Sequence, residues 1–155
     1  EHRKYYADDN VVVAKRYRQA IASGIVPILS TGDSLAQRKQ GTTFEVVAKQ
    51  IEDVIDIAGI ESFHHAVISY EPLWAIGTGR TATGEQAQEV LEFIRRLIDS
   101  KSPEIAKKIQ ILYGGSVKPE NAKDLLAMPD IDGVLVGGAS LNADSFLKIY
   151  SSFQN

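Results

Sequence analysis

Apolar residues recur along this chain with two different periods, and stretches of the two kinds alternate. Short apolar runs rich in Val and Ile predict buried strands, and longer stretches with an apolar residue every three or four positions predict amphipathic helices. The four predicted strands cover residues 25–29, 66–70, 109–113 and 133–136. A strand followed by a helix, repeated four times, is typical of a parallel α/β sheet.

Residues of capping type mark the expected helix ends. The expected N-caps are Asn10, before a helix over about residues 11–23, and two capping boxes, Thr42 with Glu45 and Thr83 with Gln86. Pro119 suits the first turn of a further helix that ends near Met128. A last helical stripe consists of Phe146, Leu147, Ile149, Tyr150 and Phe153. Residues 32–41 read as a loop with a short turn.

The predicted strands are apolar throughout, which is typical of strands that are covered on both faces. No linker, low-complexity tract or shift in composition divides the chain. At 155 residues it is long enough for one domain with a sizeable core. We therefore expect a single domain, or part of one.

Composition excludes several classes of function. The net charge is −3 without a block of like charges, so a basic surface for nucleic acid is unsupported. No apolar run approaches the ~20 residues of a membrane span, and no signal-peptide pattern opens the chain. The chain has no cysteine, which excludes disulfides, thiolate catalysis and cysteine-bound metals and fits a reducing compartment.

The segment that follows the second predicted strand carries the strongest chemical signal. Glu71 comes directly after residues 66–70, and Pro72 and Trp74 follow it, ahead of a glycine-spaced stretch. A lone Glu after a strand is usually a solvated loop charge. Here a rigid Pro and a Trp that is costly to expose follow it, and they argue against an unstructured surface loop. The order suits a catalytic acid or base beneath a loop that can close over a small anionic ligand.

Paired glycines follow the third and fourth predicted strands. They are Gly114-Gly115, followed by Ser116, and Gly137-Gly138. Such pairs let backbone N–H groups approach an anion closely, although one pair alone is often only a tight turn. If these strands are the last two of an eight-stranded α/β barrel, Gly115, Ser116, Gly137 and Gly138 converge on one phosphate, and Gly77 could add a further N–H.

Two other patterns are weaker. Residues 77–81 lack the spacing of a nucleotide-binding P-loop. His64-His65 precedes a strand rather than following one and has no partner at a recognised ligand spacing. We expect surface or packing histidines there, and no metal site.

Three segments together resemble the triosephosphate isomerase family. They are YEPLWAIGTG at residues 70–79, YGGSV at 113–117 and GVLVGGASL at 133–141. The resemblance implies a parallel (β/α)₈ TIM barrel, of which this chain supplies about the last four βα units. Residues 1–155 would then be the C-terminal part of a single barrel domain.

The resemblance also implies an activity and a set of site residues. Glu71 would be the base that interconverts dihydroxyacetone phosphate and glyceraldehyde 3-phosphate through an enediolate, without a cofactor or metal. The residues implied to bind the substrate phosphate are Gly77, Ser116, Gly137 and Gly138. The implied hinges of the lid loop are Pro72, Leu73 and Trp74 on one side and Arg80, Thr81 and Ala82 on the other. The implied protein is a cytoplasmic homodimer that binds a small triose phosphate and neither nucleic acid nor membrane.

Arg95 and Asp132 match a structural ion pair of the family. Asp33 stands where the family usually has Glu, so its expected partner Arg38 would be held less tightly, and Ser30 stands where Cys is common.

The family's electrophilic His, whose place lies just upstream of Glu1, and its substrate-binding Asn and Lys have no match in this chain. The main dimer-forming loops also belong to the missing half. An alternative is therefore a non-catalytic half-barrel, either a fragment or an assembly module. A second alternative is another phosphate-binding barrel, such as an indole-pathway or phosphoribosyl isomerase, but those lack the Tyr-Glu-Pro-Leu-Trp segment.

Overall fold

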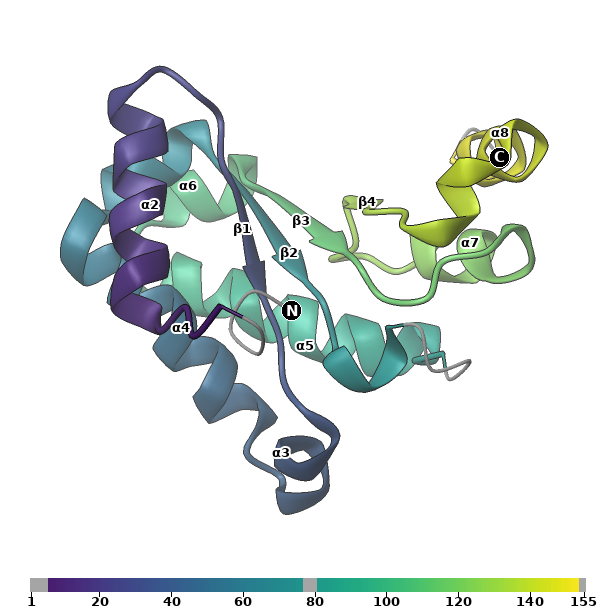
Figure 1. The fold of residues 1–155 in the computed structure, drawn as a ribbon, viewed down its shortest axis with the longest axis horizontal. Coiled ribbons are helices and arrows are strands. Elements are labelled where there is room, and N and C mark those ends of the chain that lie inside the picture. Colours follow the sequence, from purple (N-terminus) through teal and green to yellow (C-terminus); the bar gives the residue numbers. More distant parts are fainter. Residues whose placement is uncertain (1–5, 77–80, 154–155) are drawn as a thin grey trace.

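Four parallel strands form one sheet in the order β1-β2-β3-β4 (Figure 1). The computed structural model describes residues 6–76 and 81–153. The strands are β1 Ile28–Thr31, β2 Val67–Tyr70, β3 Gln110–Tyr113 and β4 Gly133–Val134. The expected alternation of strands and helices and the parallel sheet are thus confirmed, although the last strand is shorter than predicted.

The helices follow the strands in the expected rhythm. The α-helices are α2 Asn10–Ala22, α3 Leu35–Gln40, α4 Thr43–Ala58, α5 Gly84–Asp99, α6 Pro103–Lys108, α7 Pro119–Leu126 and α8 Ala143–Ser151. Three short 3₁₀ helices are η1 Ile60–His65, η2 Leu73–Ala75 and η3 Gly138–Leu141. Helices α3 and α6 were not predicted, because six residues are too few to show a helical stripe. None of the helices in the described ranges has the length and apolar character needed to cross a membrane.

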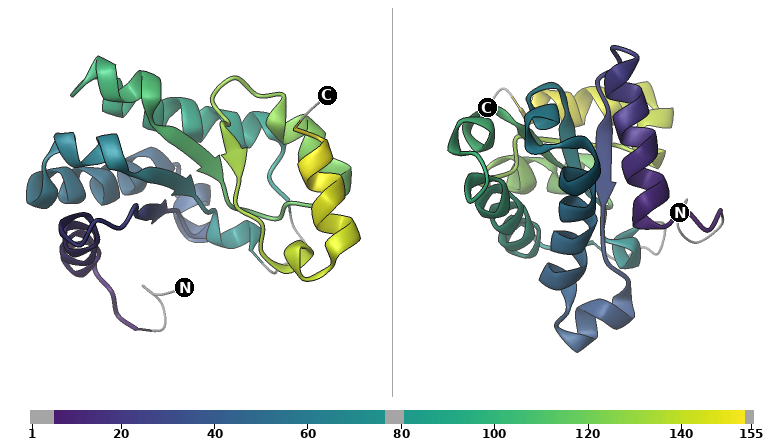
Figure 2. Two further views of the ribbon diagram at one scale, coloured as in Figure 1. Left: turned by 90° about the horizontal axis from the view of Figure 1, so that it is seen from above. Right: turned by 90° about the vertical axis from the view of Figure 1, so that its left-hand side faces the viewer.

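The core lies on one face of the sheet. Along each strand, residues alternate between this face and the opposite one, and those on the core side are buried: Leu29, Thr31, Ile68, Tyr70, Ile111 and Tyr113. Helices α4 and α5 pack on this side, against β1 and β3, with Val47, Ile51, Leu91 and Ile94 in the same cluster. Figure 2 shows α2 and α8 at opposite ends of the sheet.

The opposite face is more open, so the expectation that both faces are covered is wrong for this chain. Ile28, Ser30 and Gln110 are exposed there, and Val67 and Leu112 are only half-buried, although Ser69 on the same face is fully buried. The first strand also begins later than predicted. Ile25 and Val26 precede it and are exposed, because no described element covers them.

Two of the three predicted N-caps differ from the structure. Asp9, not Asn10, caps α2, because its carboxylate accepts the Val12 N–H at 2.8 Å. Thr42 makes no capping hydrogen bond, so the first predicted capping box is wrong. The box of Thr83 and Gln86 is confirmed in both directions.

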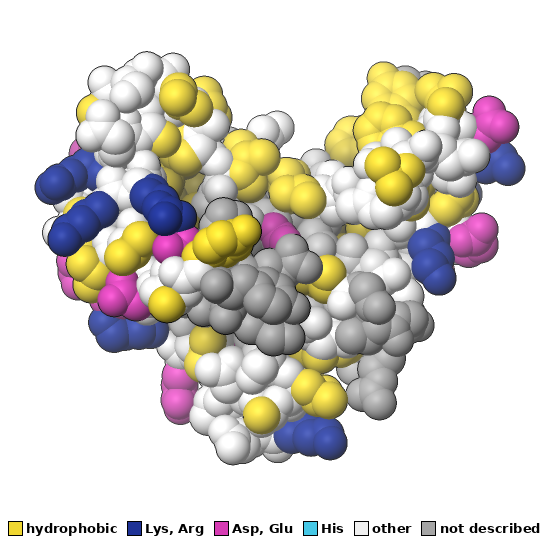
Figure 3. Space-filling view, viewed as in Figure 1, with side chains coloured by type: hydrophobic (Ala, Val, Ile, Leu, Met, Phe, Trp, Pro, Cys, Tyr) yellow, Lys and Arg dark blue, Asp and Glu magenta, His cyan; other side chains and the backbone are white. Residues whose placement is uncertain are grey.

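Apolar side chains gather on the outer surface of α8. The stripe predicted at the end of the chain is present, but only Ile149 is buried. Leu147, Tyr150 and Phe153 are each about 60% exposed, and Figure 3 shows hydrophobic side chains grouped over this end of the molecule.

Arg95 joins α5, α6 and the start of β4 at the amino-terminal edge of the sheet. Its Nε donates to Asp130 Oδ1 and its Nη2 to Asp132 Oδ2, each at 2.7 Å. Its Nη1 donates to the carbonyl of Ala106 at 2.8 Å. Asp132 Oδ2 also accepts the Ile111 N–H. The expected Arg95–Asp132 ion pair is therefore confirmed, and it is one arm of a wider joint.

Replacing Arg95 by Lys should destabilise the protein, because one ammonium cannot reproduce the planar fork that reaches two carboxylates and a carbonyl. With 22% of the side chain exposed, we expect a loss of about 2–3 kcal/mol in the free energy of unfolding. Urea denaturation measures it. The matched control is Arg96→Lys, on the exposed side of the same helix, which should change little. Equal urea midpoints for the two variants would contradict a stabilising role of Arg95.

Candidate active site

Glu71 stands at the carboxyl end of β2, where the parallel ladder continues past the strand. Its N–H donates to the carbonyl of Thr31 at 2.7 Å, and the N–H of Gly114 donates to the carbonyl of Tyr70 at 2.9 Å. These bonds fix the backbone of Glu71 from both neighbouring strands. The side chain itself is half-buried.

Two serine hydroxyls hold one oxygen of the Glu71 carboxylate. Ser30 Oγ donates to Oε1 at 2.7 Å, and Ser69 Oγ donates to the same oxygen at 3.1 Å. Ser30 and Ser69 are Cα partners in the pairing of β1 with β2. Ser69 and Glu71 are two residues apart, so their side chains leave the strand on the same side.

Glycines on both neighbouring strand ends leave the space that Glu71 occupies. A Cβ on Gly114 would lie 2.5 Å from Glu71 Cγ, and a Cβ on Gly32 would lie 2.1 Å from the Glu71 carbonyl oxygen. Both distances are too short for real atoms. Gly32 and Gly114 are therefore required by the close approach of the Glu71 residue.

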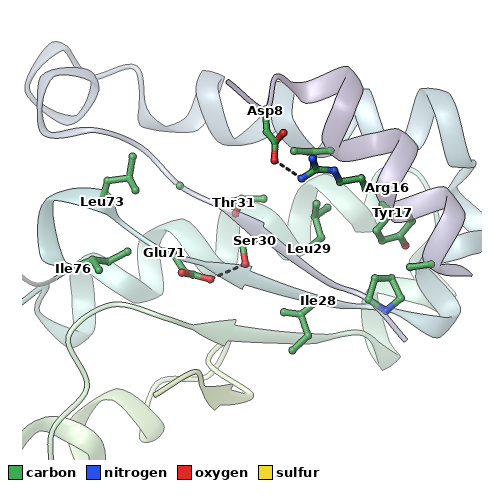
Figure 4. A pocket seen from close by; sticks show the side chains of 14 residues that line it. Asp8, Arg16, Tyr17, Ile28, Leu29, Ser30, Thr31, Glu71, Leu73 and Ile76 are labelled. Carbon is green, nitrogen blue, oxygen red and sulfur yellow. Dashed lines mark hydrogen bonds and ion pairs between the residues drawn. The ribbon is translucent and has the colours of Figure 1, made fainter. Parts of the chain in front are cut away.

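A pocket of about 520 Å³ lies beside this carboxylate. Figure 4 shows Glu71, Ser30, Leu73 and Ile76 on its wall, with an Asp8–Arg16 ion pair on the side of α2. The wall thus combines apolar side chains with the Glu71 carboxylate, while the Asp8 carboxylate is paired with Arg16. Such a cavity can take a small ligand whose reacting atom is brought to Glu71.

Asp33 is fully buried just after β1 and accepts two hydrogen bonds. Thr43 Oγ1 donates to it at 2.7 Å and the Tyr70 hydroxyl at 2.8 Å. Burial, together with the neighbouring Asp33 carboxylate, raises the pKa of Tyr70 far above its usual range, so the phenol remains a donor. Arg38, the partner expected for Asp33, instead forms an ion pair with Glu89 at 3.6 Å.

The predicted first hinge is packed against this group. Pro72 is buried, Leu73 donates its N–H to the carbonyl of Asp33 at 3.0 Å, and Trp74 lies under the Arg38 guanidinium at 5.8 Å from the ring centre. In the second hinge, Thr81 is exposed and Ala82 is buried. Gly77 and Arg80 lie outside the described residues.

Tyr113 lies beneath the first glycine pair. A Cβ on Gly115 would lie 2.0 Å from the Tyr113 hydroxyl oxygen, so a side chain at Gly115 would displace the ring. Burial raises the pKa of Tyr113 to about 12, and the nearby Ala82 backbone opposes this shift. Among the described residues its buried hydroxyl has no hydrogen-bond partner.

Three residues proposed to bind phosphate lie in the loops after β3 and β4. Ser116 is half-buried between β3 and α7, and Gly137 and Gly138 are exposed at the start of η3. Because the strands are parallel, these loops are at the same edge of the sheet as Glu71. A Cβ on either glycine would meet no atom within 4 Å, so their surroundings are open.

No cluster of three metal-ligating side chains exists within residues 6–76 and 81–153. His64 is at the other end of β2 and lies 3.3 Å from Glu61, on the surface. The imidazoles of His64 and His65 are thus remote from the carboxyl edge that carries Glu71.

Comparison with known proteins decides the family. The triosephosphate isomerase family model matches residues 1–153. The chain belongs to the triosephosphate isomerase family. It is 56% identical over 152 residues to the triosephosphate isomerase of Methylococcus capsulatus and 54% identical over 155 residues to that of Nitrosomonas europaea. It is 50% identical over 149 residues to that of Shewanella halifaxensis.

The matches cover nearly all of this chain but only part of each relative. The aligned region is 98%, 100% and 96% of the chain, and 61%, 62% and 57% of the three triosephosphate isomerases. The chain therefore spans about three fifths of the length of the family members it matches. With four parallel strands, it forms part of a TIM barrel.

Sequence reasoning missed the groups that surround Glu71. The alternation of side chains along β2 could have placed Ser69 on the same side as Glu71. Ser30 is 41 residues away, and only the strand register reveals its contact. The tight fit of Gly114 against Glu71 likewise depends on the neighbouring strand.

The raised pKa of Tyr113 predicts a loss of stability in alkali. The unfolded phenol ionises near pH 10, whereas the folded phenol keeps its proton up to about pH 12. Its contribution is therefore complete below pH 10 and is lost as the pH rises through about 12. Tyr113→Phe should flatten the fall in the free energy of unfolding over this range, as measured by denaturant titrations at several pH values. Tyr150→Phe, at an exposed site, is the control and should keep the wild-type slope.

Proposed function

We propose that the protein to which this chain belongs interconverts dihydroxyacetone phosphate and glyceraldehyde 3-phosphate, with Glu71 as the base. The observation that carries the proposal is the position of Glu71, at a strand end beside a pocket, in a chain that matches the triosephosphate isomerase family over residues 1–153. In this family a Glu base works with a closing loop. Glu71 would carry the proton between C1 and C2 of the substrate through an enediolate.

Ser116, Gly137 and Gly138, together with Gly77, are proposed to hold the substrate phosphate. Exposed glycine backbone at a strand end suits an anion, because N–H groups can approach it without a side chain between them. Residues 72–82 are proposed to form the lid, with hinges at Pro72, Leu73 and Trp74 and at Arg80, Thr81 and Ala82. Closure would exclude water from the reactive intermediate.

The chain alone is proposed to be inactive, because its sequence has no match to the family's electrophilic His or substrate-binding Lys. The open face of the sheet and the single strand neighbour of β1 within the described residues support completion by further strands. We propose that the complete barrel forms a cytoplasmic homodimer. The competing function is a non-catalytic assembly module, which would show no isomerase activity in any form.

Glu71→Asp should lower kcat of the complete protein by about 100-fold, because a side chain shorter by one methylene displaces the base by about 1 Å. A coupled assay of triose phosphate interconversion measures it. The matched control is Glu61→Asp, an exposed residue at the opposite end of β2, which should keep wild-type turnover. If the complete wild-type protein fails to interconvert the two triose phosphates, the proposed function is wrong.

Gly138→Asp should raise KM for the triose phosphates by about tenfold or more, since a carboxylate would stand where the dianion is proposed to bind. The open surroundings of Gly138 predict that the fold tolerates the change. Gly138→Asn has nearly the same bulk without the charge, so it separates repulsion from obstruction. Steady-state kinetics that give one KM for wild type and Gly138→Asp would remove Gly138 from the proposed phosphate site.

A further inference from the structure

We infer that Ser30 and Ser69 are positioning residues, which together hold the Glu71 carboxylate by one oxygen and present the other to the substrate. The inference rests on the proposed function, because it assigns these residues a part in the same reaction. It concerns two serine hydroxyls on two different strands. The resemblance of the sequence to the family implies no role in the reaction for either serine.

Strand register places both hydroxyls beside the carboxylate. Ser30 lies opposite Ser69 in the β1–β2 pairing, and Ser69 lies opposite Leu112 in the β2–β3 pairing. Glu71 is one step beyond this level on the same side of β2. The Ser69 hydroxyl therefore reaches the carboxylate from the preceding part of β2, at 3.1 Å, and the Ser30 hydroxyl reaches it from β1, at 2.7 Å.

Both hydroxyls bind the same atom, Oε1. An ionised carboxylate oxygen accepts about two hydrogen bonds, so Oε1 is saturated by Ser30 and Ser69. Within the described part of the chain no side-chain or backbone donor is bonded to Oε2. This asymmetry leaves Oε2 as the oxygen that can accept a proton from a bound substrate.

Steric contacts complete the positioning. A glutamate side chain has three rotatable bonds and loses considerable entropy when it is fixed. Gly114 lets Glu71 Cγ approach the β3 backbone closely, and the two hydroxyls then restrict the carboxylate at the end of the side chain. A base that is partly ordered before the substrate binds loses less conformational entropy in the reaction.

Within the described residues, both hydroxyls bond only to the Glu71 carboxylate. Strand pairing uses the backbone, and the Ser69 carbonyl already accepts a bond from Thr31 Oγ1. Ser69 is fully buried, and its hydroxyl donates to Glu71. Ser69→Ala removes a small donor and leaves no new polar group on the strand. Ser30 lies on the pocket wall, and Ser30→Thr keeps the hydroxyl donor.

The test compares Ser30→Ala, Ser69→Ala and the double variant in the complete protein. We expect kcat to fall about tenfold in Ser30→Ala, less in Ser69→Ala and by up to about 100-fold in the double variant, with KM changed less than about twofold. Ser30→Thr should restore kcat. Ser100→Ala, whose hydroxyl caps a distant helix end, is the control. An unchanged or increased kcat in the double variant would overturn the inference, as would a rise in KM alone.

A second measurement does not depend on activity. In protein labelled with isotopic glutamate, the carboxyl resonance of Glu71, assigned with Glu71→Gln, should shift in the double variant without substrate and return toward its wild-type position in Ser30→Thr. If the Glu71 resonance shifts in a protein that fails to isomerise triose phosphates, the positioning role is supported and the proposed function is wrong. If the protein isomerises triose phosphates but the Glu71 resonance does not shift, the proposed function is supported and the positioning role is wrong. Denaturation midpoints identify any variant that has lost its fold.

Discussion

Parallel pairing of β1, β2 and β3 in one register is the constraint on which the rest of the structure depends. It brings Ser30, Ser69 and Leu112 to one level of the sheet. It also carries the residues that follow each strand to the same edge. Glu71 then stands between two neighbouring backbones, which leave no room for a Cβ at Gly32 or Gly114. Glycine is therefore required at both positions by the close approach of the Glu71 residue.

Much of this architecture could be predicted from local patterns, and the omissions have a common cause. Glu71 and the glycine pairs were found because they follow apolar runs directly. The contact of Ser30 with Glu71 joins two strands, and no local period reports it. Helices α3 and α6 have six residues each, which is too short for a stripe. The box expected at Thr42 did not form, although the same pattern at Thr83 did.

The described chain covers one face of its sheet more completely than the other. Helices pack against Leu29, Ile68 and Ile111, while Ile28 and Gln110 on the other face are exposed. Strands with apolar residues on both faces predict cover on both sides, and here the second cover is lacking. The chain also spans about three fifths of the triosephosphate isomerases it matches. An uncovered inner face is what a part of a barrel would present.

The Arg95 joint lies at the opposite edge of the sheet from Glu71. It ties α5 to the end of α6 and to the residues before β4. None of its bonds involves a residue of the loops that follow the strands. The ion pairs and hydrogen bonds of Arg95 and the candidate active-site residues thus lie at opposite ends of the same strands. Substitutions can accumulate in the loops at one end without loosening the other, which gives the scaffold freedom to acquire altered specificity while it keeps its fold.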